Sequence, residues 1–205
     1  MDKLLGNGKY INRNLVMHTV TESGYMSARA GKIFQSKLDS YKHESDRIGM
    51  IKMLKRYAIR YPNEYYIYQQ LAATLYIERI AQYQLAFKYA ERAMSMEPND
   101  NLNIYTYACA LYYVGQLEKS YEYFTMIICK DIHEIAYDEH GEGLRYAKQL
   151  INDSVYMAGV ICQEMQKYNE AKDYFIRYLE SKKPFQYSDF TKKQALSHLS
   201  ELTKV

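Results

Sequence analysis

The segment "DIHEIAYDEHGEG" (residues 131–143) concentrates the side chains that are best able to do chemistry. His133 and His140 are seven residues apart, a spacing that places two side chains on one face of a helix. Imidazole and carboxylate groups at helical spacing can bind a divalent metal ion, so this cluster is the one feature that favours a metal-dependent enzyme. The acidic residues around the histidines are Asp131, Glu134, Asp138, Glu139 and Glu142.

The same segment supports two further interpretations. Gly141 and Gly143 are expected to break the helix that the two histidines would have to share. The segment then becomes an acidic turn, which is either solvated or a contact surface for a basic partner. We predict no bound metal and no cofactor, and retain Asp138, Glu139 and Glu142 as candidate partner contacts.

No common signature of a nucleotide site or a hydrolase is present. The patterns G-x-x-x-x-G-K-[ST], G-x-G-x-x-G, G-x-S-x-G and H-E-x-x-H are all absent. Cys109, Cys129 and Cys162 are odd in number, widely spaced and set among apolar residues. This pattern predicts reduced cysteines in the core of a cytoplasmic protein. The sequence therefore favours a protein that is not an enzyme.

The composition predicts an all-α fold. Nine Gly and three Pro in 205 residues leave few turn residues for a many-stranded sheet. Gly6 follows the Leu4-Leu5 pair too soon for a signal peptide, and the uncharged stretch 101–117 is too short and polar for the ~20 apolar residues of a membrane span. We expect no membrane partner.

The elements that position these side chains are predicted by a repeat. Ala86, Ala90 and Ala93 form one narrow helix face that ends before Pro98. The same offsets return 34 residues later and again after an insertion, with a degenerate copy upstream. Those copies are Ser120, Phe124 and Ile127, then Ala171, Phe175 and Tyr178, and upstream Met50, Leu54 and Tyr57.

Each of these helices follows another apolar segment with small residues near its middle, at 71–73, 107–110 and 157–160. Small residues at these points let two antiparallel helices approach closely. Paired helices of this length resemble the tetratricopeptide-repeat (TPR) family. The positions that match its pattern are Ala108, Leu111, Gly115, Leu117, Ser120, Phe124 and Ile127, and again Gly159, Tyr168, Ala171, Phe175 and Tyr178.

The resemblance implies a short right-handed solenoid of antiparallel helix pairs. An irregular arm, residues 1–24, precedes a TPR-like domain at residues 25–205. Its repeats are expected at 31–64, 65–100, 101–134 and 152–185. The insertion, 135–151, is expected to form one extra helix or part of a bent long helix. A solvent-facing capping helix is expected at 190–203, where Ala195, Leu196 and Leu199 share a helical spacing.

The resemblance also implies which side chains line a concave groove. We call these the groove positions: Lys32, Gln35, Asp39 and Lys42, then Tyr66, Gln69, Ala73 and Tyr76, then Leu102, Tyr105, Cys109 and Tyr112, then Asp153, Tyr156, Val160 and Gln163. The chain contains 24 Tyr, and tyrosine favours binding surfaces because its large rigid ring carries a hydroxyl and loses little entropy. Ordinary packing is the competing explanation. The predicted contacts are Tyr66, Gln69, Tyr76, Tyr105, Tyr112, Tyr156 and Gln163.

Charge is divided along the chain. Residues 1–60 hold 12 Lys/Arg and 5 Asp/Glu, whereas residues 61–160 hold 7 and 13. The tyrosine-rich part is therefore acidic, which argues against a nucleic-acid partner. We expect a protein or peptide partner. The chain is then an inhibitor or immunity protein that covers a toxin, or a chaperone or scaffold for an extended segment. The sequence does not fix its oligomeric state.

Overall fold

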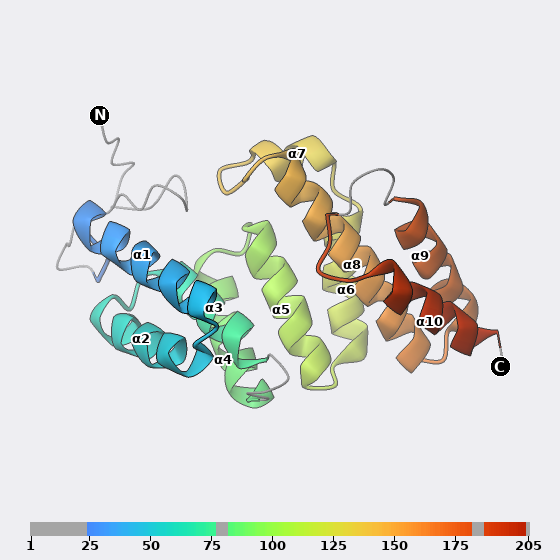
Figure 1. Ribbon diagram of the computed structural model, residues 1–205, viewed down its shortest axis with the longest axis horizontal. Coiled ribbons are helices and arrows are strands. Elements are labelled where there is room, and N and C mark those ends of the chain that lie inside the picture. Colours follow the sequence, from blue (N-terminus) through green and yellow to red (C-terminus); the bar gives the residue numbers. More distant parts are fainter. Residues whose placement is uncertain (1–23, 77–81, 182–186, 204–205) are drawn as a thin grey trace. The chain divides into compact units, whose positions relative to one another are not determined.

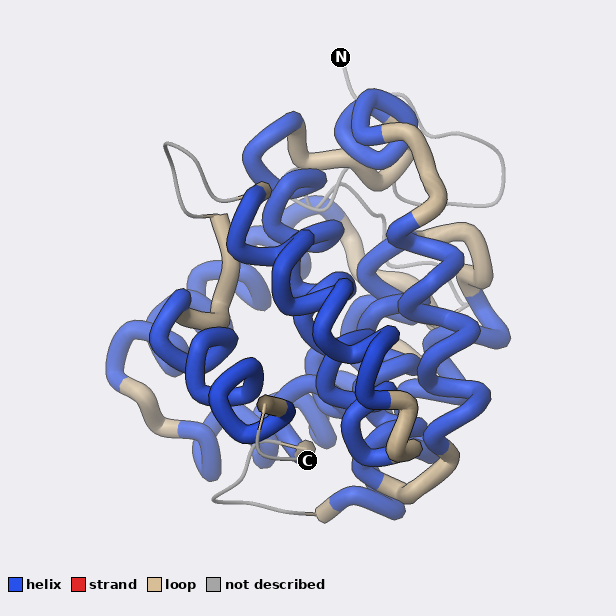
Figure 2. Tube along the Cα trace, turned by 90° about the vertical axis from the view of Figure 1, so that its right-hand side faces the viewer, coloured by secondary structure: helices blue, strands red, loops and turns tan. Residues whose placement is uncertain are grey.

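A computed structural model describes residues 24–76, 82–181 and 187–203 of the chain. Every regular element in these ranges is a helix, which confirms the all-α prediction (Figure 1, Figure 2). The chain divides into two compact units, Met1–Thr106 and Tyr107–Val205, which are described separately as the N-terminal and C-terminal units. Apart from Gly24, the predicted arm lies outside the described residues.

The N-terminal unit begins with two helices joined by a tight turn. Its helices are α1 (Ala28–Glu44), α2 (Arg47–Arg60), α3 (Tyr65–Leu75), α4 (Tyr83–Met96) and the first half of α5 (Asn101–Tyr113). The hydroxyl of Ser27 accepts from the Ala30 N–H at 3.1 Å and so caps α1. Asp46 caps α2 by accepting from the Gly49 N–H at 2.9 Å. Between these helices Ser45 adopts a left-handed conformation, with φ of 56°.

The core of the N-terminal unit lies where α3 packs against α2 and α4. Ala86, Ala90 and Ala93 are at most 1% exposed, so the predicted small-residue face does bring helices together. The buried Asn103 amide donates to the carbonyls of Ala93 and Glu97, at 3.3 and 2.9 Å. These hydrogen bonds attach the start of α5 to the end of α4.

The C-terminal unit contains the second half of α5 and five further helices. They are α6 (Leu117–Ile128), α7 (Ile132–Tyr137), α8 (Leu144–Glu164), α9 (Tyr168–Glu180) and α10 (Lys192–Leu202). The insertion contributes the end of α7 and the first turns of α8, a continuous helix of 21 residues. The helix α8 packs against α6, α7 and α9.

The core of the C-terminal unit is built on aromatic side chains. Phe124, Phe175 and Tyr178 are fully buried. A Cβ at position 159 would lie 3.1 Å from the Phe175 ring, so Gly159 makes room for that ring. The hydroxyl of Ser120 donates to the Ala108 carbonyl at 2.7 Å and joins α6 to α5.

Two finer expectations about burial can now be checked. Cys109 and Cys162 are buried free thiols as expected, but Cys129 is exposed, because it is the residue that ends α6. The helix α10 begins with a capping box between Thr191 and Gln194. It buries Ala195 but leaves Leu196 55% exposed.

No helix in the described ranges has the length and apolar character needed to cross a membrane.

Candidate partner-binding surfaces

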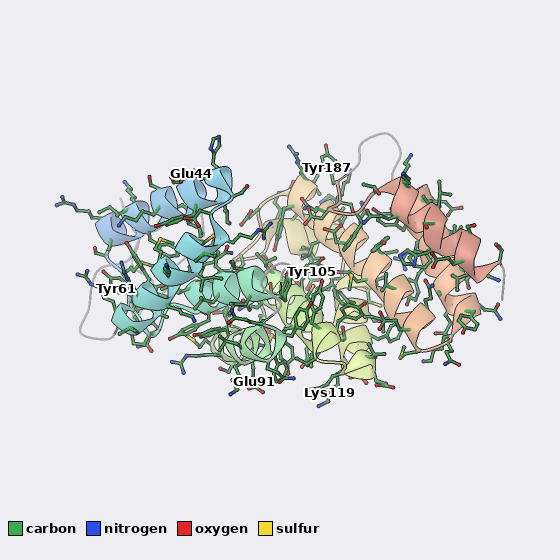
Figure 3. All side chains as sticks on the ribbon, turned by 60° about the horizontal axis from the view of Figure 1, so that its bottom comes forward. Glu44, Tyr61, Glu91, Tyr105, Lys119 and Tyr187 are labelled. Carbon is green, nitrogen blue, oxygen red and sulfur yellow. The ribbon has the colours of Figure 1, made fainter. Side chains whose placement is uncertain are left out.

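The groove positions of the N-terminal unit lie on helices that contact one another. The ring of Phe34 on α1 meets the ring of Tyr66 on α3 edge-on, with centroids 6.2 Å apart. From α3, the Gln69 amide donates to Asn103 on α5. Tyr66, Tyr76 and Tyr105 are all partly exposed, and Figure 3 shows Tyr105 on α5. These three tyrosines therefore retain surface that a partner can contact.

Gln69 differs from its neighbours in this group because it is fully buried. Its amide nitrogen is used by the hydrogen bond to Asn103, and its Oε1 has no partner within the described residues. The side chain thus joins α3 to α5 and is not accessible to a partner in this structure. A groove position alone could not reveal this, because the contact depends on a residue 34 positions away.

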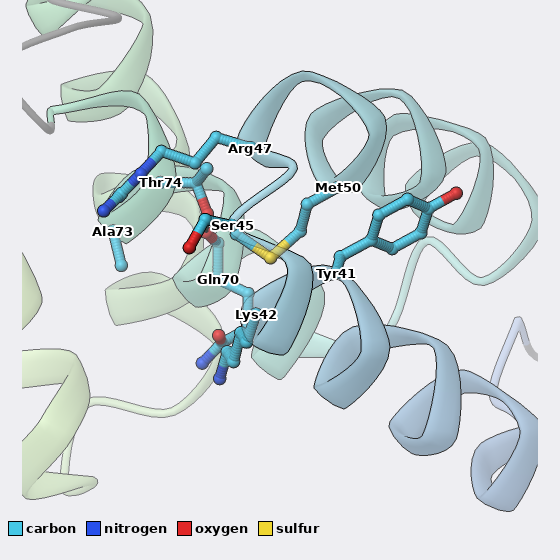
Figure 4. A pocket seen from close by; sticks show the side chains of 8 residues that line it. All are labelled: Tyr41, Lys42, Ser45, Arg47, Met50, Gln70, Ala73 and Thr74. Atoms are coloured by element: carbon cyan, nitrogen blue, oxygen red, sulfur yellow. Dashed lines mark hydrogen bonds between the residues drawn. The ribbon is translucent and has the colours of Figure 1, made fainter.

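A pocket of about 270 Å³ opens between α1, α2 and α3 (Figure 4). It is lined by Tyr41, Lys42, Ser45, Arg47, Met50, Gln70, Ala73 and Thr74. Only Lys42 and Ala73 are groove positions. Ser45 and Arg47 escaped prediction because they lie at the turn between two helices. Gln70 belongs to a run in α3, residues 67–72, that is buried without interruption and so shows no periodicity.

Three groove positions of α8, namely Asp153, Tyr156 and Gln163, are covered by residues 188–201. The buried Asp153 carboxylate accepts from the Ser188 hydroxyl and from the Asp189 N–H. Tyr156 is only 4% exposed, and its ring stacks on Phe190 with centroids 4.0 Å apart. Residues 187–201 therefore occupy the surface on which a partner was expected, and the predicted capping helix lies across the groove side of α8.

His198 holds α10 against α8 through both of its ring nitrogens. Its Nδ1 lies 2.8 Å from Gln163 Oε1, which can only accept, so Nδ1 carries the proton. Its Nε2 lies 3.0 Å from the Tyr156 hydroxyl and accepts from it in the neutral ring. The ring also stacks on Phe175 at 4.7 Å. Gln163 and Tyr156 are thus engaged within the unit.

The neutral form of His198 is the form that this site favours. Desolvation by burial lowers the pKa of His198, and the nearby Glu201 carboxylate opposes that shift. The folded state then binds fewer protons than the unfolded state near the ordinary value of 6.5, so the stability that His198 contributes is present above that pH and lost as the pH falls.

We expect α10 to detach more readily as the pH is lowered from 7.5 to 5. The lower pH favours the protonated ring of His198, whereas the folded site favours the neutral ring. Hydrogen exchange of the α10 amides, corrected for the intrinsic rate, measures this directly. His198→Phe keeps a ring against Phe175 but removes the titration, so the pH effect disappears. The control is His43→Phe, at an exposed histidine of α1. Equal pH dependence in wild type and His198→Phe would contradict the assignment.

Tyr112 and the acidic turn complete the predicted sites of the C-terminal unit. The partly exposed Tyr112 donates from its hydroxyl to Glu164 and packs edge-on against Tyr113.

In the acidic turn, Asp138 accepts from the His140 N–H at 2.9 Å. Glu139 and Glu142 are exposed. These two side chains are therefore on the surface of the turn, and their contact with a basic partner stays a prediction.

The two histidines of the acidic segment do not share a helix. The helix α7 ends at Tyr137, so His133 lies on it and His140 lies in the following turn. A Cβ at position 141 would lie 2.4 Å from the Ala136 carbonyl oxygen, which explains why the turn needs Gly141. Within the described ranges no three His, Cys, Asp or Glu side chains are grouped to hold a metal ion.

Comparison with known proteins shows a similarity of fold. No protein-family model matches the sequence, and no curated protein is detectably similar to it. Among solved structures, MamA from Desulfovibrio magneticus RS-1 (residues 41 to the end) is 11% identical with a TM-score of 0.57, covering 84% of this chain and 93% of that one. A MamA RS-1 double mutant is 13% identical with a TM-score of 0.54, over 84% and 92%. MamA is TPR-like, so the predicted TPR-like fold is confirmed.

Proposed function

We propose that this chain is a non-catalytic binding protein that holds a partner polypeptide against the groove positions of its N-terminal unit. The observation that carries the proposal is the contrast between the two units. In the N-terminal unit, Lys42 and Ala73 line an open pocket and Tyr66 and Tyr105 are partly exposed. In the C-terminal unit, the groove positions Asp153, Tyr156 and Gln163 contact residues 188–201 instead. The fold itself, a TPR-like one, supports a role in protein interaction.

The open surface is short, which favours a folded partner. Helix axes pack about 8–10 Å apart, so α1, α3 and the start of α5 span roughly 20 Å. An extended peptide rises about 3.3 Å per residue, so only about six residues would fit. A folded partner can add contacts from several of its own loops, and standard protein complexes bury about 800 Å² on each side. The most concrete form of the proposal is a cytoplasmic inhibitor or immunity protein that covers a toxin.

Removing a contact tyrosine should weaken partner binding. We expect Tyr105→Ala and Tyr66→Ala each to cost about 1–3 kcal/mol of binding free energy, because a rigid ring with a hydroxyl is lost from the contact. Calorimetry with the purified partner, isolated by affinity capture at low salt, measures this. Tyr83→Ala, at a partly exposed tyrosine of α4 outside the groove positions, is the control. Unchanged affinity in both variants, at unchanged melting temperature, would argue against the proposed surface.

A chaperone or scaffold for an extended segment is the second candidate, favoured by the similarity in fold to MamA. The two candidates differ in what they require of the partner. Binding to a chaperone or scaffold should survive when the partner is reduced to a peptide of about ten residues. Binding to an inhibitor should be lost, because the contacts come from separate parts of a folded surface. Titration of the same partner, whole and as overlapping peptides, therefore separates them.

A further inference from the structure

The pocket of the N-terminal unit presents hydrogen-bond donors from several elements. Arg47, at the start of α2, extends across the pocket on the side of Ala73 and Thr74, and Lys42 reaches it from the end of α1 (Figure 4). Ser45 adds a hydroxyl from the turn between these helices. Gln70 adds a side-chain amide from α3. Two positive charges, a hydroxyl and an amide thus face one cavity.

Gln70 is the most informative of these groups. The residue is only 8% exposed, yet within the described residues its side-chain amide makes no hydrogen bond. Its amide atoms are not among the fully buried atoms that lack a partner, so the amide reaches the pocket, where it can bond to solvent or to a ligand. The neighbouring Thr74 hydroxyl donates to the Gln70 main-chain carbonyl at 2.7 Å, which leaves the side-chain amide unused by that bond. The amide therefore has donors available to a ligand.

No lining side chain offers a negative charge. None of the eight residues around the pocket is acidic. The two carboxylates that flank Ser45 in sequence are engaged elsewhere: Glu44 accepts from the Ser40 hydroxyl at 2.8 Å, and Asp46 accepts from the Gly49 N–H at 2.9 Å. A ligand that accepts hydrogen bonds and carries negative charge therefore complements this cavity.

The backbone conformation of Ser45 also supports a ligand site at this turn. Its φ of 56° lies in the left-handed region, where glycine fits with less strain than any residue with a Cβ. A helix end of this kind usually carries glycine. Strained non-glycine residues cluster at binding sites, where their side chains are used. The hydroxyl at this turn lines the pocket, which gives the serine a use that glycine could not serve.

We propose that this pocket binds an acidic side chain of the partner polypeptide. The carboxylate pairs with Arg47 and accepts from Gln70 and Ser45, while Lys42 adds a positive charge to the same cavity. The aliphatic part of the side chain lies against Met50 and Ala73, which supply the apolar wall. The volume of about 270 Å³ is below the range typical of small-molecule sites, about 300–1,000 Å³, and suits a single side chain. This inference rests on the proposed function, for which it identifies the chemistry of one partner residue.

The test uses the full chain and a minimal probe, N-acetyl-glutamate amide. In ¹⁵N-labelled protein, the side-chain NH₂ of Gln70 and the Nε–H of Arg47 report on the pocket. We expect both signals to shift and saturate, with a Kd on the order of millimolar for one such contact. Arg47→Gln should weaken this binding at least about fivefold, because the fork-shaped donor that pairs with a carboxylate is removed. The matched control is Lys52→Gln, which removes the same charge from an exposed site on α2.

Three results with the N-acetylated amide probes would overturn the inference. They are no shift at about 50 mM probe, well above the expected Kd; equal shifts with N-acetyl-glutamine amide; or equal affinity in Arg47→Gln and wild type. Tighter binding of inorganic phosphate than of the glutamate probe would also overturn it, by assigning the pocket to a phosphate group. The probe experiment needs no partner. It can therefore fail while the tyrosine variants still weaken partner binding, which leaves the proposed function standing without this pocket.

Discussion

Replacing Phe175 by alanine is expected to destabilise the C-terminal unit by about 3–5 kcal/mol, the cost of a large cavity in a packed core. The ring is fully buried in α9, fills the space left by Gly159 on α8, and stacks on His198 of α10. Its removal therefore loosens two helix contacts together. We expect α10 to lose its hydrogen-exchange protection first, because the stack is one of the contacts that holds it.

Urea unfolding followed by circular dichroism measures the loss of stability, and hydrogen exchange assigns it to the C-terminal unit. The control is the next residue along the same helix. Ile176 is 46% exposed, so Ile176→Ala should change the unfolding free energy by no more than about 0.5 kcal/mol. Similar losses in the two variants would mean that the packing of α9 is not as described.

Stability of the N-terminal unit is expected to decrease as the pH rises from 4.5 to about 7, because of one buried carboxyl group. Glu64 is 2% exposed and accepts from the Met26 N–H at 2.7 Å. Desolvation by burial raises the pKa of Glu64 to about 7, against the opposing effect of that hydrogen bond. The folded state then holds a proton that the unfolded state releases near 4.5. Stability is fully present below 4.5 and is lost as the pH rises through 7.

A shift of this size corresponds to about 3 kcal/mol of unfolding free energy across that range. Glu64→Gln keeps an oxygen that accepts from Met26 and cannot ionise, so its stability should not follow this slope and should exceed that of wild type at pH 8. Urea titrations at pH 5 and pH 8 measure both quantities. Glu91→Gln, at an exposed position on α4, is the control. Parallel pH profiles for wild type and Glu64→Gln would exclude Glu64 as the cause.

Features that depend on local spacing could be predicted from the sequence. Ala86, Ala90 and Ala93 repeat every three or four residues, and the same offsets recur at Ser120 and Ala171, so helix positions and buried faces followed directly. The cap of α10 was not predicted, although it is also local, since Thr191 and Gln194 are three residues apart. In these cases the periodicity of one helix determines which side must be buried.

Features that depend on contacts between distant residues could not be predicted. Tyr156 was expected to face a partner, but its ring is covered by Phe190, 34 residues further along the chain. Gln69 was also expected to face a partner, but its amide donates a hydrogen bond to Asn103 on another helix. The donors around the pocket come from a turn and from a helix buried on nearly every side. No period in the sequence marks Arg47, Ser45 or Gln70 as neighbours.

The position of α10 has a consequence for which ligands the C-terminal unit can accept. A segment joined to the surface that it covers competes with any free ligand at an effective concentration in the millimolar range. A ligand that uses Tyr156 or Gln163 must first displace residues 187–201, and its apparent affinity falls by the fraction of time that the surface is uncovered. Residues 187–201 thus exclude weak and abundant ligands from this surface. Only a ligand that outcompetes α10 can bind there.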